Sequence, residues 1–310
     1  MKQRWAMILA GGDGTRLLPL TRKITGDERP KQFCRIVGDE TLLDQTRRRV
    51  DLALQPMNSM FVLTQAHERY YRGILSDVDE SRLVIQPRNA GTTPAILYGL
   101  LRLQRLCSRA TVAFFPSDHY FSNGRSFMDH VDTAFGLADS FPELIFLLGI
   151  KPNDAEQEYG WIETAPADKV TSFRRVQRFW EKPEPSLARE LMRRGCLWNS
   201  FVMIGQMSAF IRMIGLALPD LYSQFDLARP AIGSADEQGV IRTLYKNITD
   251  SNFSDEVLTT RTRDLATIPV SGTSWSDLGT PRLVMSALSA MNGPDRSKNE
   301  AAGSLALATL

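Results

Sequence analysis

A glycine-rich turn follows the first apolar run of the chain. Residues 5–10 lead directly into Gly11-Gly12-Asp13-Gly14-Thr15-Arg16. Glycines at the end of a strand let the backbone approach a ligand closely, and consecutive N–H groups can form a concave site for an anion. The guanidinium of Arg16 can complete such a site because its planar fork matches a phosphate. We therefore expect this turn to bind phosphate groups.

Two common phosphate-binding motifs do not describe this turn. A P-loop needs the pattern GxxxxGK followed by Ser or Thr, which the sequence lacks. A dinucleotide-binding fingerprint needs GxGxxG, whereas Gly12-x-Gly14 is followed by Leu17. A purely structural turn is the alternative for the glycines alone. Arg16, Pro19 and the later run Arg29-Pro30-Lys31-Gln32-Phe33 favour the binding interpretation.

The elements that must position this turn alternate between strand and helix over the first half of the chain. Strands are predicted at residues 5–10, 60–64, 83–86, 111–115 and 144–150, and helices at 41–54, 66–76, 93–107 and 127–138. Thr64 is a candidate N-cap for the second helix. This alternation predicts a mainly parallel sheet with helices on both faces. Ligands bind such sheets beyond the carboxyl ends of the strands, and Asp118 ends the run 112–118 there.

The pattern changes after residue 150. Strands are predicted at residues 159–164, 176–180 and 197–204, and helices near 187–194 and from 208 onward. We expect a mixed second half that covers one mouth of the first. Residues 292–310 are rich in Ala, Ser, Gly and Asn, and we expect a loosely attached tail.

Composition limits the class of protein and its partners. Of 310 residues, 43% are hydrophobic and 23% charged, as in soluble globular proteins. Lys and Arg number 37 against 35 Asp and Glu, a net charge of +2 that excludes a broad basic field for nucleic acid. Any anion site must therefore be local. Three distant cysteines argue against a disulfide scaffold or structural zinc.

The chain has no apolar run of the roughly 20 residues that a membrane span requires, and no signal-peptide pattern at its start. We therefore expect a cytoplasmic protein that does not cross a membrane.

The motifs together carry a resemblance to a known family. Leu9-Ala10-Gly11-Gly12-x-Gly14-Thr15-Arg16-Leu17-x-Pro19-Leu20-Thr21, followed by Pro30-Lys31-Gln32-Phe33, resembles the signature of the sugar-phosphate nucleotidyltransferases, and most closely that of mannose-1-phosphate guanylyltransferases. The resemblance continues in order over about nine-tenths of the chain. Its further motifs are Arg88-Asn89-x-Gly91-Thr92, Phe115-Pro116-Ser117-Asp118-His119, Gly149-Ile150-Lys151-Pro152, Tyr159-Gly160-Trp161-Ile162, Val176-x-Arg178-Phe179-x-Glu181-Lys182-Pro183, Leu197-Trp198-Asn199-Ser200 and Trp275-Ser276-Asp277-Leu278-Gly279.

The resemblance implies a fold and a division of labour. The expected fold is an α/β, Rossmann-like, mainly parallel mixed sheet flanked by helices, of the nucleotide-diphospho-sugar transferase type, with a smaller sugar-binding lobe. Residues 1–291 would form the catalytic domain, with a nucleotide half at about 1–150 and a sugar-phosphate half at about 151–291. The long C-terminal extension of many relatives is missing, so one catalytic unit is expected.

The implied reaction is attack of a sugar-1-phosphate oxygen on the α-phosphorus of a nucleoside triphosphate, with release of pyrophosphate. GTP and mannose-1-phosphate would give GDP-mannose. A phosphate monoester has a second pKa of about 6, so the nucleophile is mostly ionised at neutral pH and needs no general base. The reaction instead needs cations, backbone donors and Mg²⁺ to bring two polyanions together.

Charged residues receive roles from the same resemblance. Asp118 and Asp277 match the pair that holds Mg²⁺, an ion that prefers oxygen ligands. Arg16 and Lys31 are expected on the triphosphate side, and Lys182 at the sugar-1-phosphate. Pro183 predicts an extended backbone at Lys182.

Uncharged groups around them complete the expected site. The turn residues Gly11, Gly12, Gly14 and Thr15 would bind the nucleotide. Gly160, Glu181 and Asn199 are expected at the sugar. His119 is expected to have a structural role because the chemistry needs no base. Trp161, Trp180 and Trp198 could wall the pocket or simply pack in the core.

The nucleobase would be read by Gln86, Asn89, Gly91 and Thr92, which offer acceptors for the donors of guanine. Here the chain departs from the family, since guanylyltransferases usually carry Glu at the position of Gln86, whereas Gln-Pro is familiar in thymidylyltransferases. A thymidylyl or other nucleotidyltransferase acting on glucose-1-phosphate is therefore the alternative. The loop from residue 21 to 30 is longer than in typical members and could close over the triphosphate or serve an interface.

A non-catalytic sugar-nucleotide-binding regulatory subunit is an alternative of another class. Its expected mark is loss of Arg16, Lys31, Lys182 or one of the two aspartates, yet all are present. An oxidoreductase is disfavoured by the absent GxGxxG pattern. The expected partners are small molecules, with neither nucleic acid nor membrane, and a homodimer is compatible with the sequence.

Overall fold

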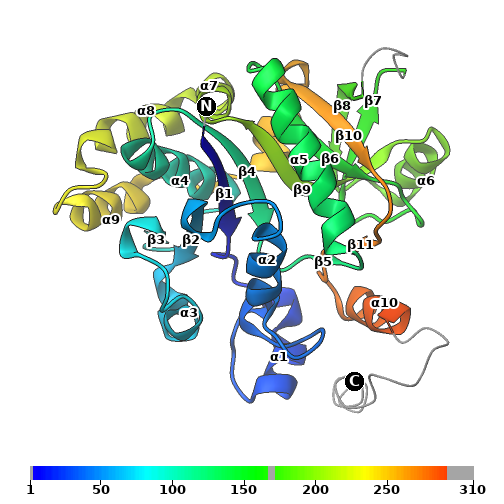
Figure 1. Cartoon of the computed structure of the whole chain (residues 1–310), viewed down its shortest axis with the longest axis horizontal. Helices are drawn as coiled ribbons and strands as arrows, with labels where there is room; N and C mark the ends of the chain where they lie inside the picture. Colours follow the sequence, from blue (N-terminus) through cyan, green and yellow to red (C-terminus); the bar gives the residue numbers. More distant parts are fainter. Residues whose placement is uncertain (1–2, 167–171, 292–310) are drawn as a thin grey trace.

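A nine-stranded mixed sheet forms the centre of the molecule (Figure 1). The computed structural model describes residues 3–166 and 172–291, so the expected tail at 292–310 lies outside the described residues. The strand order is β3-β2-β1-β4-β9-β6-β10-β8-β7, and β5 and β11 form a second, two-stranded sheet. The strands are β1 (Gln3–Leu9), β2 (Ser59–Thr64), β3 (Leu83–Gln86), β4 (Ala110–Pro116), β5 (Tyr120–Phe121), β6 (Ile145–Ile150), β7 (Gly160–Thr164), β8 (Arg174–Glu181), β9 (Leu197–Gln206), β10 (Leu265–Val270) and β11 (Trp275–Ser276).

The sheet confirms the expected mainly parallel mixed architecture. β1 is parallel to β2 and β4, β2 to β3, and β10 to β6. β9 is antiparallel to β4 and β6, and β8 is antiparallel to β10 and β7. β9 and β8 therefore run against the direction that the other strands share. All eight strands expected from the sequence are present within two residues at either end, and β5, β10 and β11 are additional.

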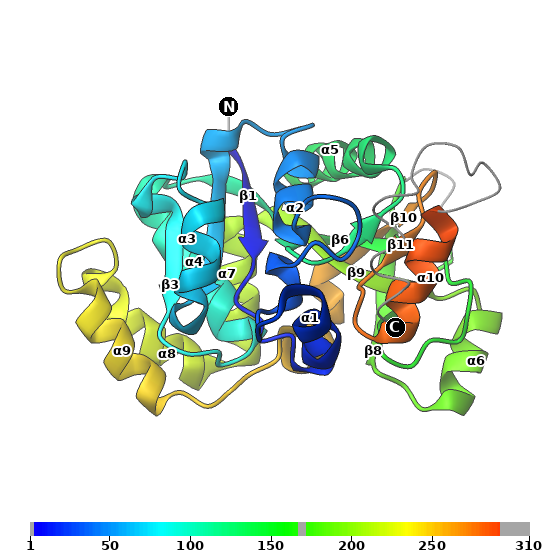
Figure 2. The ribbon, with the colours of Figure 1, turned by 90° about the horizontal axis from the view of Figure 1, so that it is seen from below.

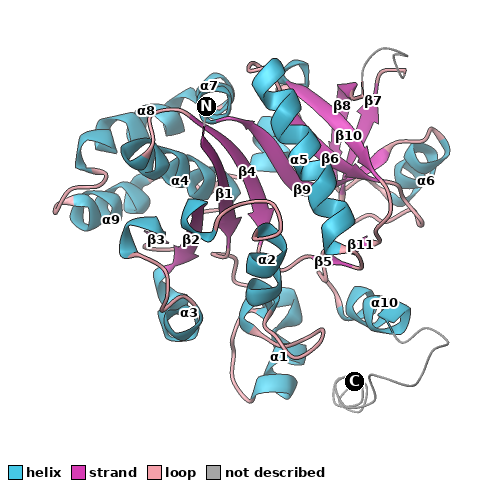
Figure 3. Ribbon diagram, viewed as in Figure 1, coloured by secondary structure: helices cyan, strands magenta, loops and turns pink. Residues whose placement is uncertain are grey.

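Helices cover both faces of the sheet, as expected (Figures 2 and 3). One apolar cluster joins the sheet to α4 (Thr92–Leu106), α7 (Met207–Ala217), α8 (Pro219–Ala228) and α9 (Glu237–Asn247). Another joins it to α2 (Leu42–Val50), α3 (Glu68–Ile74), α5 (Gly124–Ser140) and α6 (Pro185–Arg193). A third, smaller cluster lies between α1 (Leu18–Thr25) and α10 (Pro281–Met291). The last described helix thus packs against the helix that follows the glycine-rich turn.

The two halves of the chain share one sheet. β9, from the second half, lies between β4 and β6 of the first and pairs with both. β10 then continues the sheet beyond β6 and carries the β8–β7 hairpin at its outer edge. The second half therefore extends the first rather than only covering it.

The loop expected at residues 21–30 is helical up to Thr25, because α1 continues through residues 21–25 and ends at Gly26. Two further details of the helices differ from the sequence prediction. Thr64 does not cap the following helix, because its hydroxyl donates instead to the carbonyl of Gly11, at 2.8 Å. α2 ends at Val50 rather than near residue 54, since the chain turns at residues 51–54 before Pro56 begins a short 3₁₀ helix. Neither difference moves a strand of the sheet.

Helix length also bears on membrane crossing. In the two described stretches of the chain, none of the helices combines the length and apolar character that a membrane span needs.

Candidate active site

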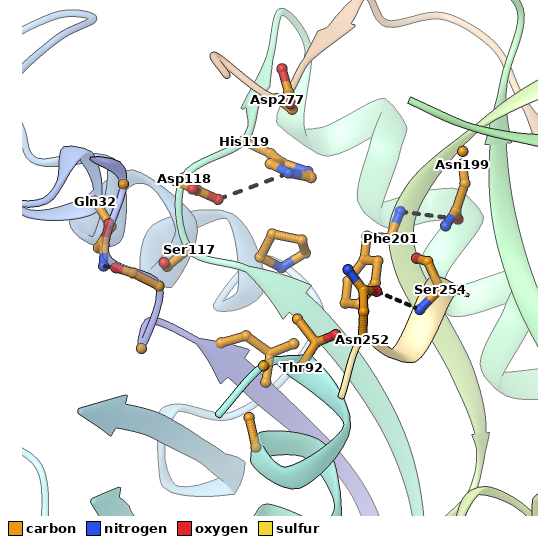
Figure 4. Close-up of a pocket in the computed structure, with 18 of the residues that line it drawn as sticks. Gln32, Thr92, Ser117, Asp118, His119, Asn199, Phe201, Asn252, Ser254 and Asp277 are labelled. Carbon is orange, nitrogen blue, oxygen red and sulfur yellow. Dashed lines mark hydrogen bonds and ion pairs between the residues drawn. The ribbon is translucent and has the colours of Figure 1, made fainter. Parts of the chain in front are cut away.

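A cleft of about 380 Å³ opens at the carboxyl ends of the parallel strands (Figure 4). Residues after β1, β3 and β4 form one side of its lining. The other side comes from β7, β8, β9 and the segment that contains β11. The cleft therefore lies at the sheet edge that the sequence predicted for a ligand.

Most of the residues expected in the site line this cleft. They are Gly11, Gly12, Gly14, Gln86, Asn89, Gly91, Thr92, Asp118, Gly160, Glu181, Asn199 and Asp277. Thr15, Arg16, Lys31 and Lys182 lie outside the lining. The side chain of Arg16 is about half exposed and forms an ion pair with Glu158, which does line the cleft. Arg16 therefore reaches the margin of the cleft from the glycine-rich turn.

The 3₁₀ turn at Lys31–Phe33 ties the glycine-rich turn to the acidic side of the cleft. Nζ of Lys31 lies 3.1 Å from Oδ2 of Asp118 and donates to the backbone carbonyl of Asp277 at 2.6 Å. The side-chain amide of Gln32 donates to the carbonyls of Ala10 at 3.1 Å and Gly12 at 2.7 Å. The ammonium of Lys31 thus lies among oxygens of both aspartate segments.

Asp118 and Asp277 are held in register by the small second sheet. β5 begins two residues after Asp118, β11 ends immediately before Asp277, and the two strands pair through Tyr120 with Ser276 and Phe121 with Trp275. Oδ1 of Asp277 accepts hydrogen bonds from the Tyr159 hydroxyl at 3.2 Å and from the Gly279 N–H at 2.8 Å. Two carboxylates far apart in the sequence thereby line one cleft.

The electrostatics keep the carboxyl group of Asp118 ionised. Burial by itself raises the pKa of Asp118, but Lys31 and His119 outweigh that effect and leave the pKa below its ordinary value. Two carboxylates suit Mg²⁺, which commonly takes one or two carboxylates together with substrate phosphates and water. Within residues 3–166 and 172–291, no group of three or more His, Cys, Asp or Glu side chains is arranged to hold a metal. Substrate phosphates would therefore have to complete the ligand set.

His119 is held as a neutral ring beside Asp118. Its Nδ1 accepts a hydrogen bond from Nε1 of Trp275 at 3.2 Å, and its Nε2 lies 3.8 Å from Oδ1 of Asp118. Burial lowers the pKa of His119 to about 4, although Asp118 and Asp277 oppose the shift. These contacts agree with the structural role expected for this residue.

The sugar-side residues come from three neighbouring strands. Gly160 on β7 is the register partner of Glu181 on β8, and a Cβ at Gly160 would lie only 2.7 Å from the Phe179 ring. Burial raises the pKa of Glu181. Oδ1 of Asn199 on β9 accepts from the backbone N–H of Phe201 at 3.1 Å, so its amide nitrogen remains as the donor.

The backbone at Lys182 corrects one prediction. The expected extended conformation is wrong, because Lys182 has φ +43°. Its N–H donates to the carbonyl of Tyr159 at 3.3 Å, which closes the end of the β7–β8 hairpin and overrides the preference set by Pro183. The side chain is exposed.

Backbone strain gathers around the cleft. In the described part of the chain, the non-glycine residues with positive φ are Lys182, Phe201 at +58° and Leu278 at +48°. Each costs roughly 1–3 kcal/mol, and such residues are typical of functional sites. Phe201 lines the cleft, and Lys182 and Leu278 directly follow the lining residues Glu181 and Asp277.

The base-side residues are braced by a distant segment. Gln86 is buried, and its Oε1 accepts from the hydroxyl of Tyr245 at 3.1 Å. Oδ1 of Asn89 accepts from the N–H of Gly91 at 3.0 Å, and its Nδ2 donates to Asp13 at 2.8 Å. Gly91 has φ +88°, and a Cβ there would lie 2.2 Å from the carbonyl oxygen of Ser251.

Sequence reasoning missed several residues that line the cleft. They are Gln32, Ser117, Glu158, Tyr159, Phe201, Asn252, Ser254 and Trp275. Some of these stand inside the quoted motifs, where their position next to expected site residues was a usable signal. Asn252 and Ser254 stand outside every motif, and they reach the cleft because Ser251 hydrogen-bonds to Ala90 and Thr93.

Comparison with known proteins adds independent findings. Residues 5–292 match the family described as nucleotidyl transferase. The chain is 27% identical over 281 residues to the alginate biosynthesis protein AlgA of Pseudomonas aeruginosa, covering 88% of this chain and 56% of that protein. It is 26% identical over 282 residues to a mannose-1-phosphate guanylyltransferase of Escherichia coli, covering 88% and 57%. The chain thus spans little more than half the length of these curated relatives.

A solved structure supports the same grouping. The crystal structure described as a mannose-1-phosphate geranyltransferase from Thermus thermophilus is similar with a TM-score of 0.76 at 25% sequence identity, covering 90% of this chain and 77% of that chain. A structure from Helicobacter pylori described as a mannose-6-phosphate isomerase shares the fold, with a TM-score of 0.69 at 16% identity, over 88% of this chain and 99% of that one.

Proposed function

The chain belongs to the nucleotidyl transferase family, and on that premise we propose that it transfers a nucleotidyl group from a nucleoside triphosphate to a sugar-1-phosphate. The proposed substrates are GTP and mannose-1-phosphate, and the products are GDP-mannose and pyrophosphate. One observation carries the proposal: the glycine-rich turn, the carboxylates of Asp118 and Asp277 and the polar ends of β7, β8 and β9 line one cleft, and Lys31 contacts both aspartate segments from outside the lining. Similarity to the mannose-1-phosphate guanylyltransferase of Escherichia coli supports the choice of substrates.

The nucleotide half would bind the triphosphate. The N–H groups of Gly11, Gly12, Gly14 and Thr15 would donate to phosphate oxygens, as consecutive backbone donors do in anion sites. Arg16 would exchange its ion pair with Glu158 for a phosphate. Because Arg16 binds from the margin, its charge would reach the phosphates that leave as pyrophosphate.

The sugar-phosphate half would present the nucleophile. Glu181 would accept from sugar hydroxyls, since a buried carboxylate is stabilised by hydrogen-bond donors. The free amide nitrogen of Asn199 would donate to a hydroxyl, and Gly160 would let the sugar approach the backbone. Lys182 would place its ammonium on the sugar phosphate.

Asp118 and Asp277 would hold Mg²⁺ between the two substrates. When bound, that ion would screen the phosphate charges and stabilise charge at the transferred group. Lys31 would keep both aspartate segments in place and limit their mutual repulsion.

Gln86 supports a second candidate for the nucleobase. Its Oε1 accepts from Tyr245 and its Nε2 donates to the carbonyl of Leu63 at 3.4 Å, which leaves one N–H donor and one acceptor lone pair for a base. Thymine offers carbonyl acceptors to such a donor, as does O6 of guanine. A thymidylyltransferase acting on glucose-1-phosphate therefore stays the alternative.

A panel assay tests the proposal. The purified protein is incubated with Mg²⁺, each nucleoside triphosphate and several sugar-1-phosphates, and pyrophosphate release is measured. GTP with mannose-1-phosphate should give the highest kcat/KM. Equal rates with other pairs would contradict the GDP-mannose proposal, and a highest rate with dTTP and glucose-1-phosphate would establish the alternative. Binding of a sugar nucleotide without any turnover would indicate the regulatory subunit.

Further proposals concern organisation. We propose residues 1–291 as the catalytic domain, a cytoplasmic location and assembly as a homodimer. Light scattering of the purified protein tests the dimer directly.

A further inference from the structure

Arg49 is a buried cation immediately behind the cleft. It lies on α2, is only 8% exposed, and takes part in no ion pair within the described stretches of the chain. Its guanidinium donates to Oγ1 of Thr46 at 2.9 Å and to the backbone carbonyl of His119 at 3.1 Å. Its Nε finds no hydrogen-bond partner among the described residues. Burial lowers the pKa of Arg49 to about 10, so the side chain is still charged at neutral pH.

Burying the charge of Arg49 without an ion-pair partner lowers the stability of the fold, so the charge calls for an explanation. Removing a charged group from water without an opposite charge is unfavourable. The two preceding arginines on the same helix avoid the cost, because Arg47 is paired with Asp77 and Arg48 is 74% exposed to water. An apolar side chain at position 49 would fill the same space without desolvating a charge.

Beyond its own helix, the guanidinium of Arg49 contacts the segment that links the two proposed metal ligands. Cζ of Arg49 lies 4.6 Å from the centre of the Phe121 ring, and its Nη2 donates a hydrogen bond to the backbone carbonyl of His119. His119 directly follows Asp118, and Phe121 is the register partner of Trp275, two residues before Asp277. Arg49 therefore binds the backbone between Asp118 and the strand that sets the place of Asp277.

We propose that Arg49 is a positioning residue for nucleotidyl transfer, fixing residues 119–121 so that Asp118 and Asp277 face the cleft together. This inference rests on the proposed function of the cleft. The guanidinium suits the task because it donates to a carbonyl and stacks on an aromatic ring at once. A lysine keeps the charge but has a smaller, non-planar head, so it replaces only part of this contact.

The test compares Arg49→Met, Arg49→Lys and the matched control Arg48→Met, whose side chain is 74% exposed on the same helix. Each variant is assayed for kcat and for the KM of both substrates. Mn²⁺ binding to the complex of each variant with the nucleoside triphosphate, without sugar phosphate, is measured by electron paramagnetic resonance, because the phosphates are needed to complete the ligand set. Arg49→Met should lower kcat by about 10- to 100-fold, because small misplacements of reacting groups cost that much, while both KM values change less than about threefold. The same variant should bind Mn²⁺ more weakly than the wild type. Arg49→Lys should recover part of both losses, and Arg48→Met should match the wild type.

Wild-type kcat and wild-type Mn²⁺ binding in Arg49→Met would overturn the inference. If Arg49→Met does not fold, Phe121→Leu removes the ring that the guanidinium stacks on, and it should lower kcat in the same manner; a wild-type kcat in that variant would also overturn the inference. Absence of pyrophosphate release by the wild type with every substrate pair would contradict the proposed function instead. The Mn²⁺ comparison would still decide the role of Arg49 in that case.

Discussion

The ammonium of Lys31 is already bound by protein groups beside the cleft, although the sequence assigned it to the triphosphate. Its ammonium contacts the carboxylate of Asp118 and the backbone carbonyls of Asp277 and Leu278. Sequence resemblance assigned this lysine to the triphosphate, but the geometry makes it first a neighbour of the proposed metal ligands. A single cation can serve both purposes if the triphosphate binds beside the two carboxylates.

The first prediction concerns Asp118. Asp118→Asn keeps the size of the side chain but removes the charge that faces Lys31, so kcat should fall by about 100-fold or more, the scale on which loss of one transition-state-stabilising group acts. Pyrophosphate release at saturating substrates measures it, with circular dichroism to check the fold. Asp132→Asn, at an exposed ion pair with Arg4, is the matched control. Substantial activity of Asp118→Asn with Mg²⁺ would remove Asp118 from the metal site.

The second prediction concerns His67 and pH. Nε2 of His67 lies 3.3 Å from Oδ1 of Asp13 in the glycine-rich turn, and the side chain is buried. Burial lowers the pKa of His67 below 6.5, although Asp13 opposes the shift. Below pH 6.5 the unfolded chain then binds a proton that the folded chain does not, so the free energy of unfolding should fall as pH falls from 6.5 and be flat above about 7.5.

His67→Gln should therefore lose less stability than the wild type between pH 7.5 and 5.5. Urea denaturation at both pH values measures the difference, with His130→Gln as the control at a surface position. Parallel pH profiles of the wild type and His67→Gln would show that His67 titrates alike in the folded and unfolded chains.

At the scale of elements, apolar periodicity located the strands that carry most of the site. β4 and β9 are buried along nearly their whole length and β1 along its middle four residues, so continuous apolar runs marked all three. β10 escaped prediction because Pro269 interrupts a run that otherwise reads as a strand. β5 and β11 have two residues each, too few for any periodicity, although they determine where Asp118 and Asp277 lie.

Some of the site could not be predicted because it depends on contacts between distant segments. Ser251 exchanges backbone hydrogen bonds with Ala90 and Thr93, and the N–H of Phe253 donates to Oγ1 of Thr92 at 2.8 Å. No local pattern in residues 251–254 indicates a partner about 160 positions away. Gly91 was the one sign of this contact in the sequence, because the carbonyl of Ser251 leaves no room for a side chain at position 91.

The third prediction compares two glycines with positive φ. Gly91→Ala combines a strained backbone with a clash against the carbonyl of Ser251, whereas Gly38→Ala, at φ +73°, meets nothing within 4 Å. The left-handed conformation alone costs an L-residue roughly 1–2 kcal/mol, so Gly38→Ala should lower the free energy of unfolding by about 1 kcal/mol and Gly91→Ala by about 3 kcal/mol.

Gly91→Ala should also raise the KM for the nucleoside triphosphate, because Gly91 and Thr92 line the cleft. Chemical denaturation and steady-state kinetics of both variants provide the measurements. Equal loss of stability in the two would mean that the 251–254 segment yields to the added methyl group.

At the scale of the whole molecule, the cleft depends on a sheet that neither half of the chain completes. β4 and β6 come from the first half, but they do not lie side by side, because β9 of the second half lies between them. The two proposed metal ligands are divided between the halves in the same way, since Asp118 follows β4 and Asp277 follows β11. The two sides of the cleft that we propose for the two substrates therefore belong to one continuous sheet.

The fourth prediction is that residues 1–150 do not fold alone. Without β9, the apolar edges of β4 and β6 have no strand to pair with, and Phe114 and Phe146 lose cross-strand neighbours that are buried in the complete chain. The fragment should unfold without a cooperative transition and give a poorly dispersed NMR spectrum. Co-expression with residues 151–310 should restore both the dispersed spectrum and pyrophosphate release, since the missing strand is then supplied in trans. A cooperative transition in the isolated fragment would contradict this view and would mean that the nucleotide half is an independent folding unit, with β9 an addition to a sheet already stable without it.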